Sequence, residues 1–284
     1  MRAASNILRF GLPAMLATLL WVAPSPGAFA RGGATEVDVE LVLAVDISYS
    51  MDMEEQKLQR DGYIQALTSS EVLKAIRGGL TGKIAVTYFE WAGYNTQRVV
   101  VPWQIIDGPE TADAFVAKLN ATPISRWSRT SVSGAILYGQ ELFENNGYDA
   151  ARRVLDISGD GANNSGGPVP EARDRAVKSG IVINGLPIMI YNGRRSVFDM
   201  DDLDEYYSDC VIGGPGAFMI AIKEREQFVA ATRTKILREI AGNPDVIPLP
   251  GGMWIMRANS EQDAPRKKMD CRVGEKQWEE RYRN

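Results

Sequence analysis

Leu41-Val42-Leu43-Ala44-Val45-Asp46-Ile47-Ser48-Tyr49-Ser50 runs from apolar residues into a carboxylate, Asp46, and then places hydroxyls at alternate positions, Ser48 and Ser50. An apolar run that ends in this way is typical of a strand buried on both faces, as in parallel α/β sheets. Such sheets bind ligands at the carboxyl ends of their strands, and these oxygens suit a hard cation such as Mg²⁺. The alternative is that the Asp and Ser side chains only cap the following helix.

Composition narrows the classes of function. The 284 residues are 45% hydrophobic, which is enough for one sizeable core. A net charge of -4 and scattered Lys and Arg argue against a nucleic-acid binder. The chain contains no histidine, which excludes a Ser-His-Asp triad, a His general base and His-ligated zinc. Two cysteines cannot build a thiolate zinc site either.

Residues 1–30 are typical of a secretory signal peptide. Arg2 and Arg9 supply positive charge, residues 10–22 are apolar, and Ala28-Phe29-Ala30 fits a small-residue cleavage site. The pattern predicts cleavage near Ala30 and a periplasmic or secreted protein. The alternative is a membrane anchor, but the apolar core is short for a span, so no stable membrane span is expected after cleavage.

Export bears on the two cysteines, Cys210 and Cys271. In an oxidising compartment, two cysteines favour a disulfide over two buried thiols, which is the alternative. A Cys210–Cys271 bridge would tie the C-terminal extension, residues 242–284, back to the body of the protein. The body itself is expected over residues 31–241.

Strand-like and helix-like segments alternate along residues 31–241. The expected strands are 37–45, 84–91, 98–106, 154–158, 181–190 and 217–222, and the expected helices are 52–69, 110–119, 131–145, 170–178 and 224–240. This order predicts a doubly wound α/β fold with a mostly parallel sheet, one antiparallel edge strand and helices on both faces. Residues 192–209 are expected to form an acidic surface loop.

Two further loops carry oxygen-bearing side chains. Thr130 stands directly before an expected helix, and Asp160 stands directly after an expected strand. Strand-end loops of an open α/β sheet can converge at one edge, which would gather three hydroxyls and two carboxylates. Such an all-oxygen set selects Mg²⁺, Mn²⁺ or Ca²⁺. The alternatives are that Thr130 caps its helix and that Asp160 only shapes a turn.

These residues resemble the metal-ion-dependent adhesion site of von Willebrand factor type A domains. The residues that match its three motifs, in chain order, are Asp46, Ser48 and Ser50, then Thr130 with Ala135-Ile136, then Asp160 with Gly161. The resemblance covers about residues 37–240. The signal peptide and the stretch that begins at Asp209 also resemble a bacterial exported branch, the DUF1194 family. Ser128-Arg129 and Gly159 depart from the usual residues around these motifs, so no ligand preference carries over.

The resemblance implies a role for each residue. Ser48, Ser50 and Thr130 would coordinate Mg²⁺, Mn²⁺ or Ca²⁺ directly, and Asp46 and Asp160 would act through water or hydrogen bonds. Neutral direct ligands leave the ion electrophilic, with an open position for a carboxylate of a protein partner. The expected function is therefore an adhesion-type protein-binding module and not an enzyme.

The rim of the site should set specificity, and its candidate residues are Tyr49, Arg126, Trp127 and Arg129. The alternative for Trp127 is a packed aromatic. A competing function is a Mg²⁺-dependent hydrolase, such as a phosphatase, that uses the same site. The lack of histidine and of an obvious nucleophile counts against it. A nucleotide-binding fold lacks the Gly-x-Gly-x-x-Gly motif that it would need after a strand.

Overall fold

A computed structural model describes residues 33–190, 200–242, 255–257 and 267–282. Apart from the N-terminal segment, residues 34–284 form one compact unit. The expected signal peptide, residues 1–30, lies outside the described residues and stays a prediction. Within the described part of the chain, every helix is too short or too polar to cross a membrane.

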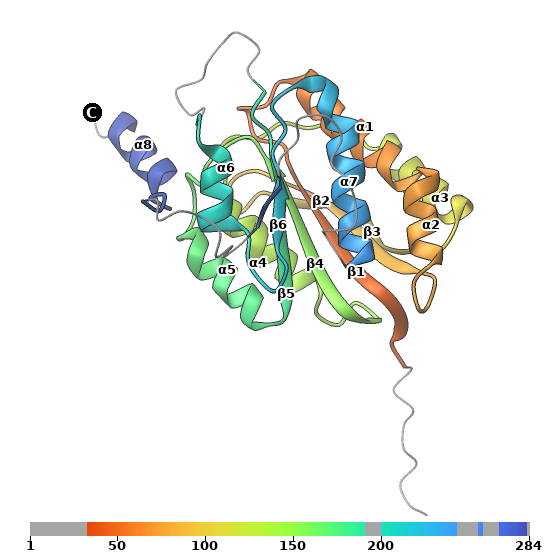
Figure 1. Cartoon of the computed structure of the whole chain (residues 1–284). Coiled ribbons are helices and arrows are strands. Elements are labelled where there is room, and N and C mark those ends of the chain that lie inside the picture. The colour runs from red at the N-terminus through yellow and green to blue at the C-terminus, as the bar shows by residue number, and fades with distance from the viewer. Residues whose placement is uncertain (1–32, 191–199, 243–254, 258–266, 283–284) are drawn as a thin grey trace, which may run out of the picture. The chain divides into compact units, whose positions relative to one another are not determined.

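Seven strands in the described residues form one sheet in the order β3-β2-β1-β4-β5-β6-β7 (Figure 1). Their bounds are β1 (Thr35–Asp46), β2 (Ile84–Trp91), β3 (Gln97–Ile106), β4 (Tyr148–Gly159), β5 (Ile181–Pro187), β6 (Phe218–Ile220) and β7 (Ile255–Arg257). The central strands pair in parallel, whereas β3 and β7 are antiparallel edge strands. The predicted fold class is confirmed, with β7 as a second antiparallel edge.

Strand β1 lies in the middle of the sheet and is buried on both faces. Leu41 and Leu43 pack into the core on one face of the sheet, and Val42 and Ala44 pack into the core on the other. All four side chains are fully buried. The apolar run therefore forms the central strand that its composition predicts.

Helices cover both faces of the sheet (Figure 1). One face carries α1 (Met53–Leu67), α2 (Ser70–Arg77), α3 (Pro109–Ala121) and α7 (Phe228–Ala241). The other carries α4 (Val132–Leu142), α5 (Val169–Lys178), α6 (Leu203–Tyr206) and a short π-helix, Tyr207–Val211. A further helix, α8 (Val273–Tyr282), follows near the C-terminus.

The segment from 203 to 211 corrects one prediction. Sequence composition predicts a surface loop over 192–209, but Leu203, Tyr206 and Tyr207 are buried. A Cβ on Gly185 would lie only 2.7 Å from the Tyr207 ring, so this glycine makes room for the aromatic side chain. The acidic residues around it favoured a surface loop, but the aromatic pair Tyr206 and Tyr207 packs on the sheet. Residues 191–199 of the predicted loop lie outside the described residues.

Cys210 and Cys271 form a disulfide, with their Cα atoms 5.5 Å apart. The predicted pairing is confirmed, and the alternative of two buried thiols is wrong. The bridge joins the π-helix to the residues that lead into α8. Residues 271–282 of the C-terminal extension therefore lie against the body of the protein, beside the loops that carry Ser48, Ser50 and Thr130.

Candidate metal centre

Two neighbouring strands bring the first and third motifs together. β1 and β4 are parallel partners, with Val45 opposite Ser158, so both strands end at the same edge of the sheet. Asp46 is the last residue of β1, and Asp160 follows β4 directly. The Ser48 amide donates a 2.7 Å hydrogen bond to Oδ1 of Asp46, which folds the first loop over the strand end.

The side-chain oxygens of these two loops form a chain of contacts. The Oγ atoms of Ser48 and Ser50 lie 2.8 Å apart, and Ser50 donates a 2.6 Å hydrogen bond to Oδ1 of Asp160. Octahedral Mg²⁺ at its usual 2.0–2.1 Å bond lengths separates adjacent ligand oxygens by about 2.9 Å. The observed spacing is therefore close to that of a compact octahedral shell.

The second motif joins the same edge through backbone hydrogen bonds. The Trp127 amide donates to the Ile47 carbonyl at 2.9 Å, which fixes the loop of residues 124–130 beside the first motif. Two hydrogen bonds then join Thr130 to Asn164. The Thr130 backbone N–H donates to Asn164 Oδ1 at 2.9 Å, and the Asn164 backbone N–H donates to the Thr130 carbonyl at 2.8 Å. A Cβ on Gly161 would lie 3.9 Å from Thr130 Oγ1, so this hydroxyl lies beside the third motif.

The capping alternatives do not hold. Asp52, not Asp46, Ser48 or Ser50, caps α1, in a reciprocal capping box with Glu55. The cap of α4 is provided by Ser131, whose Oγ accepts from the Gly134 amide at 3.1 Å, and not by Thr130. Asp160 receives the Ser50 hydroxyl and so does more than shape a turn.

Asp46 is the buried carboxyl group of the site. Its side chain is fully buried, and its Oδ2 has no hydrogen-bond partner among the described residues. Burial raises the pKa of Asp46 to about 7, against the opposing effect of hydrogen bonds from Ser48 and from the Asp160 backbone. A buried carboxylate oxygen without a partner is costly unless a proton or a cation compensates it. The donor set therefore fits a divalent cation.

The chemistry of the set also limits which metal it suits. In the described part of the chain, no group of three or more His, Cys, Asp or Glu side chains could hold a metal. The present site instead combines two carboxylates with the hydroxyls of Ser48, Ser50 and Thr130, which are ligands for Mg²⁺, Mn²⁺ or Ca²⁺. The ligand role of each residue stays a prediction, while their proximity is a fact of the structure.

The predicted rim residues surround this edge. Tyr49 and Trp127 are 59% and 54% exposed, so the packed alternative for Trp127 is wrong. Arg126 donates a 2.7 Å hydrogen bond to the Tyr49 carbonyl, and its guanidinium lies 5.3 Å from the centre of the Tyr49 ring. Arg129 is also exposed. Two cationic and two aromatic side chains thus stand next to the oxygen cluster.

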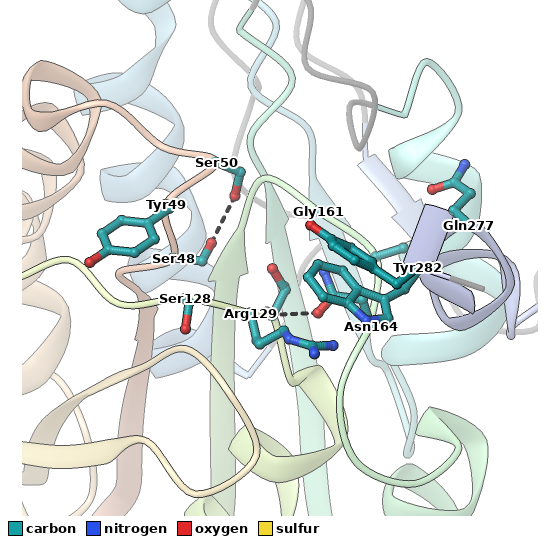
Figure 2. Close-up of a pocket in the computed structure, with 13 residues that line it drawn as sticks. Ser48, Tyr49, Ser50, Ser128, Arg129, Gly161, Asn164, Gln277 and Tyr282 are labelled. Atoms are coloured by element: carbon teal, nitrogen blue, oxygen red, sulfur yellow. Dashed lines mark hydrogen bonds between the residues drawn. The ribbon is translucent and has the colours of Figure 1, made fainter. Parts of the chain in front are cut away.

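A pocket of about 380 Å³ opens over the cluster. Figure 2 shows Ser48 and Ser50 on one side of it and Gln277 and Tyr282 of α8 on the other, with Arg129 and Asn164 between them. The contribution of α8 could not be foreseen, because its sequence has no periodic apolar face. Only the predicted disulfide placed the extension near the body of the protein.

Asn163 is a second residue that sequence reasoning missed. It is fully buried, its Oδ1 accepts from the Ser133 amide at 3.0 Å, and its Nδ2 donates to Glu275 Oε1 at 2.8 Å. It therefore links the loop after β4 both to the start of α4 and to α8. The available signal was the Asn163-Asn164 pair, which follows the Asp160-Gly161 motif after one residue.

Comparisons with known proteins agree with this architecture. A family model described as a protein of unknown function, DUF1194, matches residues 36–244. Among curated proteins, none matches the sequence.

Several solved structures share the fold at low sequence identity. Proximal thread matrix protein 1 of the mussel byssus, in a structure whose adhesion-site motif holds zinc, is 11% identical with a TM-score of 0.54, over 73% of this chain and 49% of that one. The pilus adhesin SpaC of Lactobacillus rhamnosus GG is 13% identical with a TM-score of 0.52, over 73% and 31% of the two chains. A von Willebrand factor type A protein of Catenulispora acidiphila is 14% identical with a TM-score of 0.50, over 72% and 43%. The chain thus spans half or less of each of these proteins, and the likeness establishes the fold.

Proposed function

The chain belongs to the DUF1194 family of proteins of unknown function, and we propose that it is an exported, metal-dependent protein-binding module. In this proposal, Asp46, Ser48, Ser50, Thr130 and Asp160 hold a divalent cation, Mg²⁺ or else Mn²⁺ or Ca²⁺. An acidic residue of a protein partner completes the site. The module acts by adhesion and not by catalysis.

One observation carries the proposal. Three loops that are far apart in sequence place five oxygen-bearing side chains at one sheet edge, around a buried carboxylate whose Oδ2 has no partner among the described residues. Proteins compensate such groups, so the arrangement is costly unless it serves a ligand. The resemblance of the fold to adhesion-type domains supports the same interpretation.

The side chains explain how the site would bind without reacting. The neutral hydroxyls of Ser48, Ser50 and Thr130 cancel little of the charge of a bound ion, which therefore keeps its attraction for an anion. Asp46 accepts from the Ser48 amide and so fixes the first loop, while Asp160 accepts from the Ser50 hydroxyl; both carboxylates would supply compensating charge. When bound, the cation supplies an electrophilic position for a carboxylate at the exposed side of the cluster.

Calorimetric titration of the mature protein with Mg²⁺ and Mn²⁺ tests the site. We expect Asp46→Ala and Ser50→Ala to lose the binding heat, because both remove oxygens of the cluster. Ser70→Ala is the matched control: Ser70 is an exposed serine at the start of α2, outside the site. Circular dichroism of each variant separates loss of the site from loss of the fold. Equal affinity of the parent and both site variants would refute the metal centre.

A second experiment tests the partner. Immobilised mature protein is used to capture proteins from the native envelope, with Mg²⁺ and with EDTA. We expect specific capture that EDTA and Ser50→Ala both abolish. Capture that survives EDTA and Ser50→Ala alike would contradict a metal-dependent interaction.

A further inference from the structure

The pocket over the oxygen cluster has a second, cationic element. The guanidinium of Arg129 lies on the ring of Trp278 in α8, with its central carbon 3.4 Å from the ring centre. Trp278 in turn stacks on Tyr282, with the ring centres 4.2 Å apart. All three side chains line the same pocket as Ser48, Ser50 and Thr130. One face of the guanidinium is therefore occupied by an aromatic ring, while its hydrogen-bond donors point along its edge.

Arg129 is held in place but is not neutralised. Its backbone has a φ of 73°, a conformation that residues other than Gly, Asn and Asp rarely adopt. Among the described residues, no carboxylate or carbonyl accepts a hydrogen bond from its guanidinium. A strained backbone and a stacked, unpaired cation beside a candidate binding site are features that proteins keep for ligands.

The helix that supports Arg129 is itself fixed to the body of the protein. The disulfide from Cys271 anchors the chain just before α8, and Glu275 accepts a 2.8 Å hydrogen bond from Asn163. A Cβ on Gly274 would lie 2.2 Å from the Asn163 carbonyl oxygen, so only glycine allows this close approach. Trp278 is thus a fixed wall of the pocket, and the position of Arg129 is set before any ligand arrives.

We infer that Arg129, held flat on Trp278, binds a second carboxylate of the ligand, so that the pocket selects partner segments that carry two carboxylates over segments that carry one. The inference rests on the proposed function for the first carboxylate, which the oxygen cluster takes. Bidentate pairing of a guanidinium with a carboxylate supplies the second point of recognition. A pocket of about 380 Å³ admits a protruding acidic segment. The second carboxylate comes from a neighbouring acidic side chain or from a chain terminus.

Three synthetic peptides, each with an uncharged dansyl label on its N-terminus, distinguish these sources. One is Gly-Gly-Asp-Gly-Gly with an amidated end and a single carboxylate; the second is Gly-Gly-Asp-Asp-Gly, also amidated; the third is Gly-Gly-Gly-Gly-Asp with a free end. Their affinities for the mature protein are measured by fluorescence anisotropy in Mn²⁺. We expect at least one two-carboxylate peptide to bind about tenfold more tightly than the single-carboxylate peptide, as a charge-assisted pair at a half-open site allows.

Two variants test whether that preference depends on Arg129 and on Trp278. Arg129→Met, which keeps an unbranched side chain but removes the guanidinium, is expected to abolish the preference, and Trp278→Leu to reduce it. Arg77→Met, which removes an exposed charge at the end of α2, is the control for net charge and is expected to retain the preference.

The inference is overturned if the parent binds all three peptides equally, if it binds none of them, or if Arg129→Met keeps the preference. The proposed function fails separately, when calorimetry shows no Mn²⁺ binding by the parent. A preference that persists in such a protein and depends on Arg129 would support the arginine site without the metal.

Discussion

Replacing Asp46 with Asn should make the metal-free protein more stable and at the same time destroy the metal site. The pKa of Asp46 is raised from 3.8 to about 7 by burial. A carboxyl whose folded pKa is raised binds its proton more tightly in the folded state, so stability is lost as pH rises from about 4 to about 7. At pH 8 that difference corresponds to about 4 kcal/mol of destabilisation in the absence of metal.

The Asn side chain has the same shape and keeps an Oδ1 acceptor for the Ser48 amide, but it carries no charge. Its NH₂ donors enter the environment of Oδ2, which offers no hydrogen-bond partner among the described residues, at a cost of about 1–3 kcal/mol. The net effect in EDTA at pH 8 is a gain of about 1–3 kcal/mol over the parent. At pH 5 the advantage should disappear, because the parent carboxyl is then protonated.

Urea unfolding in EDTA at pH 5 and pH 8 measures these differences, and a second series adds excess Mg²⁺. We expect the cation to stabilise the parent, by about 3 kcal/mol at a hundredfold excess over its dissociation constant, and to leave Asp46→Asn unchanged. Asp38→Asn is a control from the other part of β1, where the carboxylate already accepts from the Thr81 and Gly82 amides. It should be destabilised yet keep the Mg²⁺ response.

Two results would refute this reasoning. In the first, Asp46→Asn is less stable than the parent at pH 8 in EDTA, which would mean that the buried charge is compensated by the protein itself. In the second, Mg²⁺ stabilises the parent and Asp46→Asn equally, which would place the cation elsewhere.

Three other predictions concern the core, the disulfide and the N-terminus. Lys235 is fully buried against two carboxylates, so Lys235→Met should cost about 3–5 kcal/mol in urea unfolding, whereas the exposed Lys223→Met should cost less than about 1 kcal/mol. Replacing Cys210 and Cys271 with Ser opens a loop with a sequence separation of 61, and should lower stability by about 4 kcal/mol and speed hydrogen exchange in α8. Slow exchange of α8 in that variant would show that the bridge is not what fixes the helix. Mass spectrometry of the exported protein should find a mature chain that begins after Ala30, and an intact N-terminus there would contradict the signal peptide.

The central fold was predictable because its signals are local. The apolar run before Asp46 is long enough to identify a strand buried on both faces, and the short turn between residues 91 and 97 identifies a hairpin. The ends of β1 and β4 then determine where Asp46 and Asp160 lie, since parallel neighbours end at one edge. Sequence order therefore places the first and third motifs together, whereas Thr130 was identified by its resemblance to the second adhesion-site motif.

The wall formed by α8 was not predictable, because it depends on tertiary contacts. Within α8 only Gly274 is buried, and half of its 10 residues are charged, so no apolar periodicity predicts how the helix packs. What holds it are the disulfide, the bond between Asn163 and Glu275, and the stack of Arg129 on Trp278. The disulfide was predictable from the two cysteines, but the other two contacts join segments that are more than a hundred residues apart, and no local sequence pattern indicates their pairing.

The location of a bound ion tests the proposed site most directly. Anomalous scattering from a crystal of the mature protein grown with Mn²⁺ gives that position without assumptions about the ligands. The proposal predicts a peak within about 2.0–2.4 Å of the hydroxyls of Ser48, Ser50 and Thr130, typical of a hard divalent cation with oxygen ligands. Mn²⁺ bound only at other acidic residues, or no peak at this edge of the sheet, would contradict it.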